Sequence, residues 1–429
     1  MTDEIPCNSG KSLLLQGILL LVHTGMRSEN RPQVTVLRSV RSSAFRASMS
    51  RGAIYKAEEL FKNVADKNHP METVLTIIQG KGTLPREQAG RNIHYDDASL
   101  ANYKKVEQGD FIIHLRSFEG GLEMANEDGI VSPAYTILRC KKPHSSLFYE
   151  AYFHTDEFIN HILSKSVEGI RDGRQISYEA FKWLGLPYCD VSEQERIAQL
   201  FCTLSHRIEK QQQMVDALKK YKRGVMQHIF RQLPSRNGAE WTCVRLGDIF
   251  KKVSRRNTDG VIKNVITNSA EYGLIPQRDF FDKDIAVDGN TANYYVIENG
   301  DFVYNPRKSN SAPYGPFNRY ALSEQGIISP LYTCLVLQAD ISPSYLAWYF
   351  KSDAWYRYIY DNGSQGVRHD RVSMTDDLLM GIPVMYPSHV KQLLYADILD
   401  MVEARLQATQ KTLDFLNKMR DGYMRQLFI

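Results

Sequence analysis

The chain has 429 residues, of which 43% are hydrophobic and 24% charged, a balance typical of soluble proteins with substantial cores. This length suits two or three domains. A formal net charge of +4 is mildly basic, so composition permits a nucleic-acid partner without requiring one. The six cysteines are scattered without closely spaced pairs, which favours reduced thiols and a cytoplasmic protein over a disulfide framework.

The first 50 residues are predicted to be an atypical leader, because nothing in the second half of the chain corresponds to them. The apolar run at residues 13–22 resembles a signal peptide only faintly, since Asp3 and Glu4 stand where basic residues are usual. The run is also too short to cross a bilayer, which takes about twenty apolar residues. We therefore expect this segment to contribute little to function.

Residues 51–190 are predicted to form a domain of mixed α/β class. Strands are expected at Asp110–Leu115 and Ala134–Arg139, where apolar and β-branched residues cluster. A helix is expected at Ser145–Lys165, where aromatic residues recur at helical spacing.

Residues 191–233 are predicted to form one long amphipathic helix, because no Gly or Pro interrupts Ser192–Gln232 before Gly224. About forty residues at 1.5 Å each would extend about 60 Å. The next stretch, residues 234–240, has the composition of a turn or linker. The helix carries an apolar seam close to a coiled-coil pattern, made of Ile197, Leu200, Leu204, Ile208, Val215, Leu218 and Val225.

A second domain of the same class is predicted at residues 241–387, followed by a second long helix at residues 388–429. Strands are expected at Asp301–Tyr304 and Leu331–Leu337, and a helix at Ser342–Asp361. The apolar seam expected on the second long helix comprises Leu394, Ile398, Met401, Leu406, Leu413, Leu416 and Met419.

The two halves of the chain repeat each other. Val106-Glu-Gln-Gly-Asp-Phe111 returns as Ile297-Glu-Asn-Gly-Asp-Phe302, and Gly129-Ile-Val-Ser-Pro133 returns as Gly326-Ile-Ile-Ser-Pro330. Three further matches pair Gly169 with Gly366, Gly185 with Gly381, and Gly224 with Gly422. All matches keep the same order, so we interpret the chain as two tandem copies of a domain followed by a long helix.

Connectivity predicts how the two helices pair. The first helix ends where the second domain begins, and the linker is too short for that domain to return along the helix. The second helix is therefore expected to run antiparallel to the first. That arrangement would place the two domains at opposite ends of the pair, related by a pseudo-twofold axis.

Signals for catalysis are mostly missing. Gly10-Lys11-Ser12 ends like a phosphate-binding loop, but Ile5 stands where that motif needs glycine. The sequence contains neither a His-Glu-x-x-His nor a Gly-x-Ser-x-Gly motif. Asn305-Pro306-Arg307 lacks the further Pro and aromatic residue that adenine methyltransferases use. We therefore predict a non-catalytic chain with neither a metal nor a cofactor of its own.

Glycine-bearing basic loops are candidates for binding DNA. They are Gly169-Ile-Arg-Asp-Gly-Arg-Gln175 in the first half and Ser364-Gln-Gly-Val-Arg-His-Asp-Arg371 in the second. Arg and Gln are side chains that read base edges in the major groove, and basic residues neutralise phosphates. Arg171 and Arg368 recur in both copies, so they could equally well hold each loop to its own domain. The candidates here are Arg171, Arg174, Gln175, Gln365, Arg368, His369 and Arg371.

A second divergent segment lies between the shared motifs. It supplies Arg116 in the first half and Arg307 and Lys308 in the second. Divergent loops on a shared frame are expected of two modules that read different ligands, although neutral drift of exposed loops would look the same. On the long helices, the aromatic and basic residues Tyr221, Arg223, Tyr423 and Arg425 are candidates for docking partner helices, although charge on a helix face is more often simple solvation.

The two helix ends are Leu218-Lys-Lys-Tyr-Lys-Arg-Gly-Val-Met-Gln-His-Ile-Phe230 and Leu416-Asn-Lys-Met-Arg-Asp-Gly-Tyr-Met-Arg-Gln-Leu-Phe428. Together with the domain entry Trp241-Thr-Cys-Val-Arg-Leu-Gly-Asp-Ile-Phe250, they are similar to the DNA-specificity (S) subunit of type I restriction-modification enzymes. The resemblance covers residues from about 54 to 429. The first domain departs from the entry pattern, having Ile54-Tyr-Lys-Ala-Glu-Glu-Leu-Phe61 instead.

This resemblance implies that each domain is a target-recognition domain reading one half of a bipartite DNA site. The helix pair would set the gap between the half-sites and dock two methyltransferase subunits, and motor-nuclease subunits would join that core. S-adenosylmethionine, ATP and magnesium would belong to those partners, and no membrane is involved. Two alternatives stay open: a fused restriction-methyltransferase with its own catalysis, and a coiled-coil scaffold that binds proteins.

Overall fold

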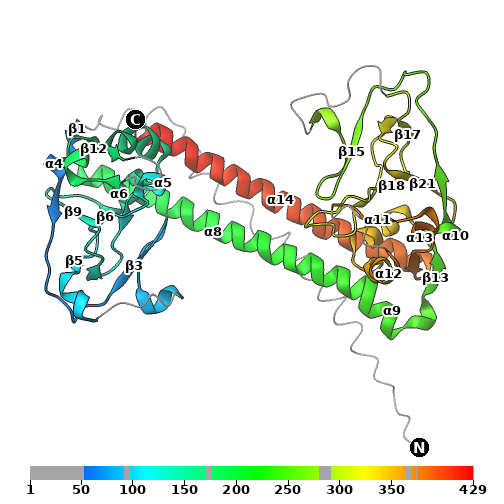
Figure 1. Cartoon of the computed structure of the whole chain (residues 1–429), viewed down its shortest axis with the longest axis horizontal. Coiled ribbons are helices and arrows are strands. Elements are labelled where there is room, and N and C mark those ends of the chain that lie inside the picture. The colour runs from blue at the N-terminus through cyan, green and yellow to red at the C-terminus, as the bar shows by residue number, and fades with distance from the viewer. Residues whose placement is uncertain are drawn as a thin grey trace, which may run out of the picture. The chain divides into compact units, whose positions relative to one another are not determined.

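The computed structural model describes residues 53–90, 97–169, 175–279, 291–363, 370–372 and 374–428, so the predicted leader lies outside the described residues. The chain divides into two compact units (Figure 1). Unit 1 comprises Met1–His206 with Lys418–Ile429, and unit 2 comprises Arg207–Asn417. Both units mix helices with strands, as expected from the sequence.

Unit 1 is built on a four-stranded antiparallel sheet with the order β2-β9-β6-β7. Helix α6 (Ser146–Phe153) packs four aromatic residues against it, and its Tyr149 and Phe153 contact Phe61 and Phe111 of the sheet. The sheet strands are β2 (Phe61–Val64), β9 (Thr136–Cys140), β6 (Phe111–Ile113) and β7 (Glu123–Met124). The expected strands at 110–115 and 134–139 therefore appear as β6 and β9.

Short strand pairs and single helical turns complete unit 1. The pairs are β1 (Ala53–Lys56) with β12 (Gly185–Tyr188), β3 (Leu75–Ile78) with β4 (Gly82–Pro85), β5 (Lys104–Val106) with β8 (Gly129–Val131), and β10 (Val167–Glu168) with β11 (Gln175–Ile176). The helical turns are α4 (Ala57–Leu60), α5 (Ser117–Gly120) and α7 (Tyr178–Phe181).

The helix expected at 145–165 is broken after α6. The Thr155 hydroxyl donates to the Tyr152 carbonyl and accepts from the Phe158 amide, which replaces the regular backbone pattern at this point. The chain continues as a π-helical turn at Glu157–Ile162 and a 3-10 turn at Leu163–Ser166. Burial of Phe158 and Leu163 keeps both turns against the core of unit 1.

Unit 2 has a four-stranded antiparallel sheet of corresponding order, β14-β21-β18-β19. Its strands are β14 (Phe250–Val253), β21 (Thr333–Leu337), β18 (Phe302–Tyr304) and β19 (Phe317–Arg319). The short pairs are β13 (Thr242–Arg245) with β22 (Pro383–Tyr386), β15 (Ile266–Ser269) with β16 (Gly273–Pro276), and β17 (Tyr295–Ile297) with β20 (Gly326–Ile328). The helices are α10 (Leu246–Ile249), α11 (Pro343–Lys351), α12 (Tyr356–Asn362) and α13 (Asp376–Met380), so the single helix expected at 342–361 is observed as two.

The repeated Gly-Asp-Phe motif is a turn before the third strand of each sheet. Gly109 and Gly300 have φ values of 91° and 96°, a left-handed conformation that favours glycine. The carboxylates of Asp110 and Asp301 accept the amides of Glu107 and Glu298, each at 2.9 Å. The motif therefore recurs because it closes this turn.

Helices α8 (Val191–Gln227) and α14 (His389–Leu427) are the long helices expected from the sequence (Figure 1). The helical path of α8 continues through a π-helical turn (His228–Gln232) and α9 (Leu233–Arg236), so the predicted linker at 234–240 begins as helix. Pro234 fits there because it lies in the first turn of α9, where a missing N–H costs nothing.

A buried glutamine opens each long helix. In unit 1, Gln194 donates to the Cys189 carbonyl at 2.8 Å and accepts the Ser145 amide at 2.9 Å. In unit 2, Gln392 donates to the Pro387 carbonyl at 2.9 Å and accepts the Ser342 amide at 2.8 Å. Each glutamine thus ties the start of a long helix to the helix that covers the sheet.

Within unit 2 the two long helices run in opposite directions. Lys222 of α8 contacts Glu403 of α14 at 2.8 Å, whereas the earlier residue Gln211 donates to the later Thr409 carbonyl at 2.9 Å. Val215 packs with Leu406 and Leu413 between these contacts. Within unit 1, Phe428 near the end of α14 stacks on Phe201 of α8, with ring centroids 5.5 Å apart.

The predicted seam on the second long helix is wrong at two positions. Leu394 and Met401 are 41% and 48% exposed, so they lie outside the buried face. Two polar residues that the sequence did not suggest, Gln392 and Thr409, occupy that face. The buried residues are Gln392, Ala396, Leu399, Val402, Leu406, Thr409, Leu413 and Leu416. None of the helices in the described part of the chain is both long and apolar enough to cross a membrane.

Candidate nucleic-acid interface

The structure joins two of the predicted basic segments in unit 2. Arg307 follows β18 and forms an isolated antiparallel bridge with Arg371. The Lys308 amide donates to the Asp370 carbonyl at 2.8 Å, and the Val372 amide donates to the Pro306 carbonyl at 2.9 Å. Arg307, Lys308 and Arg371 are therefore neighbours, although more than sixty residues separate them in sequence.

A cluster of buried asparagines fixes the position of Arg307. The Asn305 side chain accepts the Arg307 amide at 3.0 Å and donates to the Asn268 carbonyl at 3.3 Å. Asn268 in turn donates to the Val303 carbonyl at 2.9 Å and accepts from Asn318 at 2.7 Å. Since all three side chains are buried and hydrogen-bonded, the backbone that carries Arg307 is held rigidly to the sheet.

The basic side chains at this bridge are open to solvent and weakly paired. Arg307 is exposed, and the side chain of Arg371 is 36% exposed with its nearest carboxylate, Asp370, at 3.8 Å. Desolvation raises the pKa of the neighbouring Tyr332, and the positive charges of Arg307 and Arg371 oppose that rise. Two guanidinium groups thus lie beside one phenol, available to an anionic or hydrogen-bonding ligand.

Unit 1 presents Arg116 at the corresponding place, three residues after the end of β6. Arg116 is exposed, its Nε lies 3.8 Å from the Glu119 carboxylate, and its amide donates to His114 Nδ1 at 3.3 Å. The α5 turn that follows contacts β11, which begins at the exposed Gln175. Arg116 and Gln175 therefore lie on adjoining elements.

His114 takes the position in unit 1 that Asn305 takes in unit 2. Burial lowers the pKa of His114, and its ring lies edge-on to Tyr135 with centroids 6.5 Å apart. Sequence reasoning missed both His114 and Asn305. The repeat contained the signal, because these are the first residues after the shared strand at which the two copies differ in chemical type.

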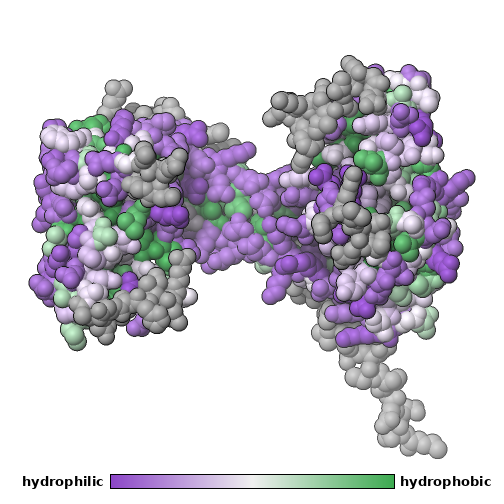
Figure 2. Space-filling model, viewed as in Figure 1, coloured by the Kyte–Doolittle hydropathy of each residue, from purple (hydrophilic) through white to green (hydrophobic). Residues whose placement is uncertain are grey.

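Five of the predicted DNA-binding residues, namely Arg171, Arg174, Gln365, Arg368 and His369, lie outside the described residues. Of the predicted docking residues, Tyr221 is 39% exposed and Arg223 is exposed on α8. At the end of α14, Tyr423 packs against the core of unit 1, whereas Arg425 is exposed. Figure 2 shows the surface of the long helices as mainly hydrophilic, with hydrophobic residues interspersed.

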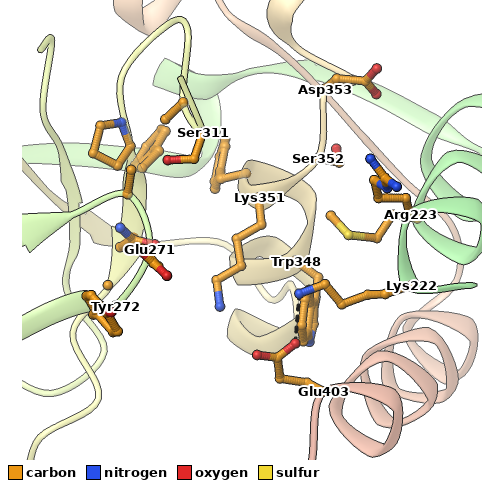
Figure 3. A pocket seen from close by; sticks show the side chains of 18 of the residues that line it. Lys222, Arg223, Glu271, Tyr272, Ser311, Trp348, Lys351, Ser352, Asp353 and Glu403 are labelled. Carbon is orange, nitrogen blue, oxygen red and sulfur yellow. Dashed lines mark hydrogen bonds and ion pairs between the residues drawn. The ribbon is translucent and has the colours of Figure 1, made fainter. Parts of the chain in front are cut away.

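Unit 2 also contains a cleft of about 620 Å³ beside this interface (Figure 3). Helix α8 contributes Lys222 and Arg223 to it, α11 contributes Trp348 and Lys351, and α14 contributes Glu403. Lys222 is neutralised by Glu403, at 2.8 Å. Within the described ranges, no group of three or more His, Cys, Asp and Glu side chains is arranged to hold a metal ion.

Comparison with solved structures identifies the fold. The S subunit of a type I restriction-modification system from M. genitalium matches with a TM-score of 0.51 at 13% identity, over 88% of this chain and 96% of that one. A chain from a structural study of complex assembly and conformational transition of the type I R-M system matches with a TM-score of 0.51 at 15% identity, over 88% of this chain and 98% of that one. An HsdS subunit from Thermoanaerobacter tengcongensis gives 0.46 at 14% identity, over 89% and 97%.

No protein-family model matches the sequence, and no curated protein matches it either. The likeness is therefore one of fold. The chain has the fold of type I restriction-modification S subunits, which confirms at that level the resemblance predicted from its helix ends.

Proposed function

We propose that this chain is the non-catalytic DNA-specificity subunit of a type I restriction-modification complex. Its fold supports this role, and the observation that carries it is the pair of neighbouring arginines, one exposed and one partly exposed, at the Arg307–Arg371 bridge. Arg reads guanine edges bidentately and contacts phosphates, so two neighbouring arginines on a rigid backbone suit the major groove. The chain would bind DNA and leave methylation and cleavage to partner subunits.

In this proposal the domains at residues 51–190 and 241–387 each read one half of a bipartite site. Arg116 and Gln175 would act in the first domain, and Arg307, Lys308 and Arg371 in the second. The strands of the two domains correspond, but the side chains proposed to contact bases differ between them. The two half-sites should therefore differ in sequence. Helices α8 and α14 would set the gap as an antiparallel pair.

Partner docking on α14 is supported by an apolar stripe on its exposed side. Leu394, Met401 and Phe415 are 41%, 48% and 61% exposed, and Ala408, also exposed, completes a spacing of seven residues. This period is that of a helix laid along another helix. Since each of these positions faces away from the buried seam, we propose that the stripe receives a helix of a methyltransferase subunit.

A binding experiment with charge-deleted variants tests the proposed function. The chain, together with its methyltransferase partner, is titrated with duplex DNA carrying the sequence that the complex selects and with a scrambled duplex. Arg371→Ala is expected to weaken binding to the selected duplex by about 1–3 kcal/mol while changing binding to the scrambled one less. Arg357→Ala is the matched control, since Arg357 is exposed but paired with Asp361 on α12.

Three results would count against the proposal. The first is a complex that binds both duplexes equally. The second is an Arg371→Ala variant that keeps full preference for the selected duplex. The third is methyl transfer by the isolated chain supplied with S-adenosylmethionine, because that activity would place catalysis on this subunit.

A further inference from the structure

The cleft in unit 2 holds a lysine whose charge is not neutralised. Lys351 is the last residue of α11, and Figure 3 shows its side chain extending into the open space between Glu271 and Lys222. Its ammonium lies 4.7 Å from the centroid of the Trp348 ring, over which Lys222 also lies at 5.9 Å. A buried indole thus forms one wall, with two ammonium groups above it.

Most other charges around this cleft are already paired. Lys222 contacts Glu403 at 2.8 Å, and Asp353 contacts Arg231 at 3.2 Å. For Lys351 and Arg223, in contrast, no ion pair with an acidic residue is found among the described residues. Desolvation lowers the pKa of Lys351, the carboxylate of Glu403 opposes this, and repulsion from Lys222 adds to it. An anion entering the cleft would relieve this unfavourable charge.

The cleft is continuous with the proposed base-reading loop. The segment that begins at Asn305 carries Arg307 and Lys308 and then returns past Ser311, which lines the cleft, to Pro316. Gly315 closes this loop, since a Cβ there would lie 2.0 Å from the Asn305 carbonyl oxygen. The loop that carries Arg307 and Lys308 therefore also forms part of the lining of the cleft.

We infer that this cleft binds a backbone phosphodiester of the DNA next to the half-site read by unit 2, with Lys351 and Arg223 as its cations. The inference rests on the proposed function. Ser311 presents an exposed hydroxyl on the lining, whereas the buried Ser352 hydroxyl already donates to the Tyr349 carbonyl at 2.6 Å. Lysine binds phosphate as a point charge and does not discriminate between bases. This contact therefore adds affinity and fixes the position of the Arg307 loop along the DNA.

The charge of the cleft selects a diester over other anions. The carboxylates of Glu271 and Glu403 lie on the same lining as Lys351. A phosphodiester carries one negative charge, whereas a terminal phosphate carries nearly two near neutral pH and is repelled more strongly. Duplex DNA also presents phosphates at a fixed distance from the bases at the reading loop, which a free phosphate cannot do.

Salt dependence tests this inference without knowledge of the target, because phosphate contacts act on any duplex. The complex of the chain with its methyltransferase partner is titrated with a random-sequence duplex between 50 and 200 mM salt, as wild type and as Lys351→Met. Methionine keeps an apolar stem over Trp348 and removes the charge. We expect a several-fold loss of affinity and a slope of log K against log salt that is smaller by about 0.9.

Two further variants make the result unambiguous. Lys351→Glu is expected to weaken binding more than Lys351→Met, because it adds repulsion to the lost attraction. Lys251→Met, at an exposed lysine of β14 that does not line the cleft, is expected to leave the slope unchanged. Thermal unfolding of each variant checks that it is folded. Because Lys351 is exposed to solvent, we expect its replacement to cost little stability.

The outcomes separate this inference from the proposed function. If Lys351→Met binds random duplex with the wild-type affinity and slope while Arg371→Ala loses sequence preference, the cleft does not hold a phosphate and the proposed function stands. If Lys351→Met instead weakens assembly with the methyltransferase and leaves the salt slope unchanged, the cleft receives an acidic protein segment and the inference is overturned. If the wild-type complex binds no DNA, the proposed function itself fails.

Discussion

His154 in unit 1 shows how much a single side chain determines. Its Nδ1 lies 2.8 Å from the Glu150 carbonyl oxygen and its Nε2 lies 3.3 Å from the Glu123 carboxylate. The Glu150 carbonyl and the ionised Glu123 carboxylate both accept, so His154 donates to both of them only when both of its ring nitrogens carry protons. Glu123 is fully buried and also accepts the amides of Gly80 and Gly82, so the pair ties the end of α6 to the β3–β4 turn.

The pKa values of this pair predict the pH dependence of unit 1. Burial opposes the charge on His154, but the hydrogen bond to Glu123, the charge of that carboxylate and the contacts with Glu150 together outweigh it, so the pKa of His154 is raised above 6.5. Burial likewise opposes ionisation of Glu123, but the hydrogen bonds from His154, Gly80 and Gly82 hold its pKa below 4.5. Burial raises the pKa of Glu150 and lowers that of His114, so burial disfavours the charged form of both neighbours.

The direction in which pH changes the folding stability follows from the pKa shift of each partner. A raised His pKa stabilises the folded state fully below pH 6.5, and this is lost as pH rises through the folded-state value. A lowered Glu pKa stabilises it fully above pH 4.5, and this is lost as pH falls through its folded-state value. The pair therefore contributes most between these two limits.

Replacing the histidine tests this. We expect His154→Gln to lower the free energy of unfolding by about 2 kcal/mol between pH 5 and 6, and by less as pH rises towards 9, because the wild type loses its own ion pair there. Denaturant unfolding of both proteins across this range measures the difference. His161→Gln, at an exposed histidine of the same unit, is the control. A difference between wild type and His154→Gln that does not change with pH would show that the ring is neutral.

At the residue scale, the sequence indicated candidate residues for contact with DNA but not the residues that hold them in place. Arg307 and Arg371 stood out because they lie in segments where the two copies diverge. The adjacency of these two arginines could not be predicted, because it depends on backbone hydrogen bonds between Pro306 and Val372 and between Lys308 and Asp370. Asn268, Asn305 and Asn318 look like ordinary surface residues, and only their burial shows that they hold the loop.

At the scale of elements, helix α14 was predicted to within a residue or two at each end, because its apolar period is uninterrupted. Its buried face was predicted less well. The helix carries two apolar stripes, and hydrophobicity alone does not say which one faces α8. The buried stripe includes Gln392, which is stable there because its amide is fully hydrogen-bonded, and Thr409, whose carbonyl accepts Gln211.

The exposed stripe predicts a partner interface. We expect the double variant Met401→Lys with Phe415→Lys to keep its stability within about 0.5 kcal/mol per site, because both side chains are already exposed. The same variant should lose association with the methyltransferase subunit, since two lysines would have to be desolvated in a helix interface. Sedimentation of the mixed subunits measures this association.

A matched control separates this effect from general surface change. Val261→Lys places a lysine at a side chain that is 71% exposed on unit 2, away from α14. It should leave association intact. Normal association of the double variant would show that the partner docks elsewhere, for example at Tyr221 and Arg223.

At the scale of the whole molecule, the repeat is what made the architecture predictable. Correspondence between distant motifs indicated two domains and two long helices, and the described elements of each unit follow the same order. The segment Ile54–Phe61, which departs from the entry pattern of the second domain, still folds as β1 and α4 leading into β2. It lacks the Trp and Gly of the second domain's entry, but Ala57, Leu60 and Phe61 are buried and hold it in place. The specificity of the DNA contacts could not be predicted, since loops of different length do not align with base positions.

The proposed spacer role predicts a change in geometry. Seven residues inserted into α8 after His206, and seven into α14 after Asn417, lengthen each helix by about 10.5 Å while nearly preserving its faces. The preferred gap between half-sites should then grow by about three base pairs, at 3.4 Å per base pair. Binding of a set of duplexes that differ only in gap length measures this. An unchanged optimum with full affinity would mean that the helices do not set the gap.

The measurement that tests the central claim most directly is selection of bound sequences from a random duplex library by the chain in complex with its methyltransferase partner. We expect a motif of two unlike specific parts separated by a gap of fixed length and no sequence preference. Replacing Arg307 and Arg371 together should relax only one of the two parts. A single continuous motif, or no enrichment of any sequence, would show that the two domains do not read two half-sites.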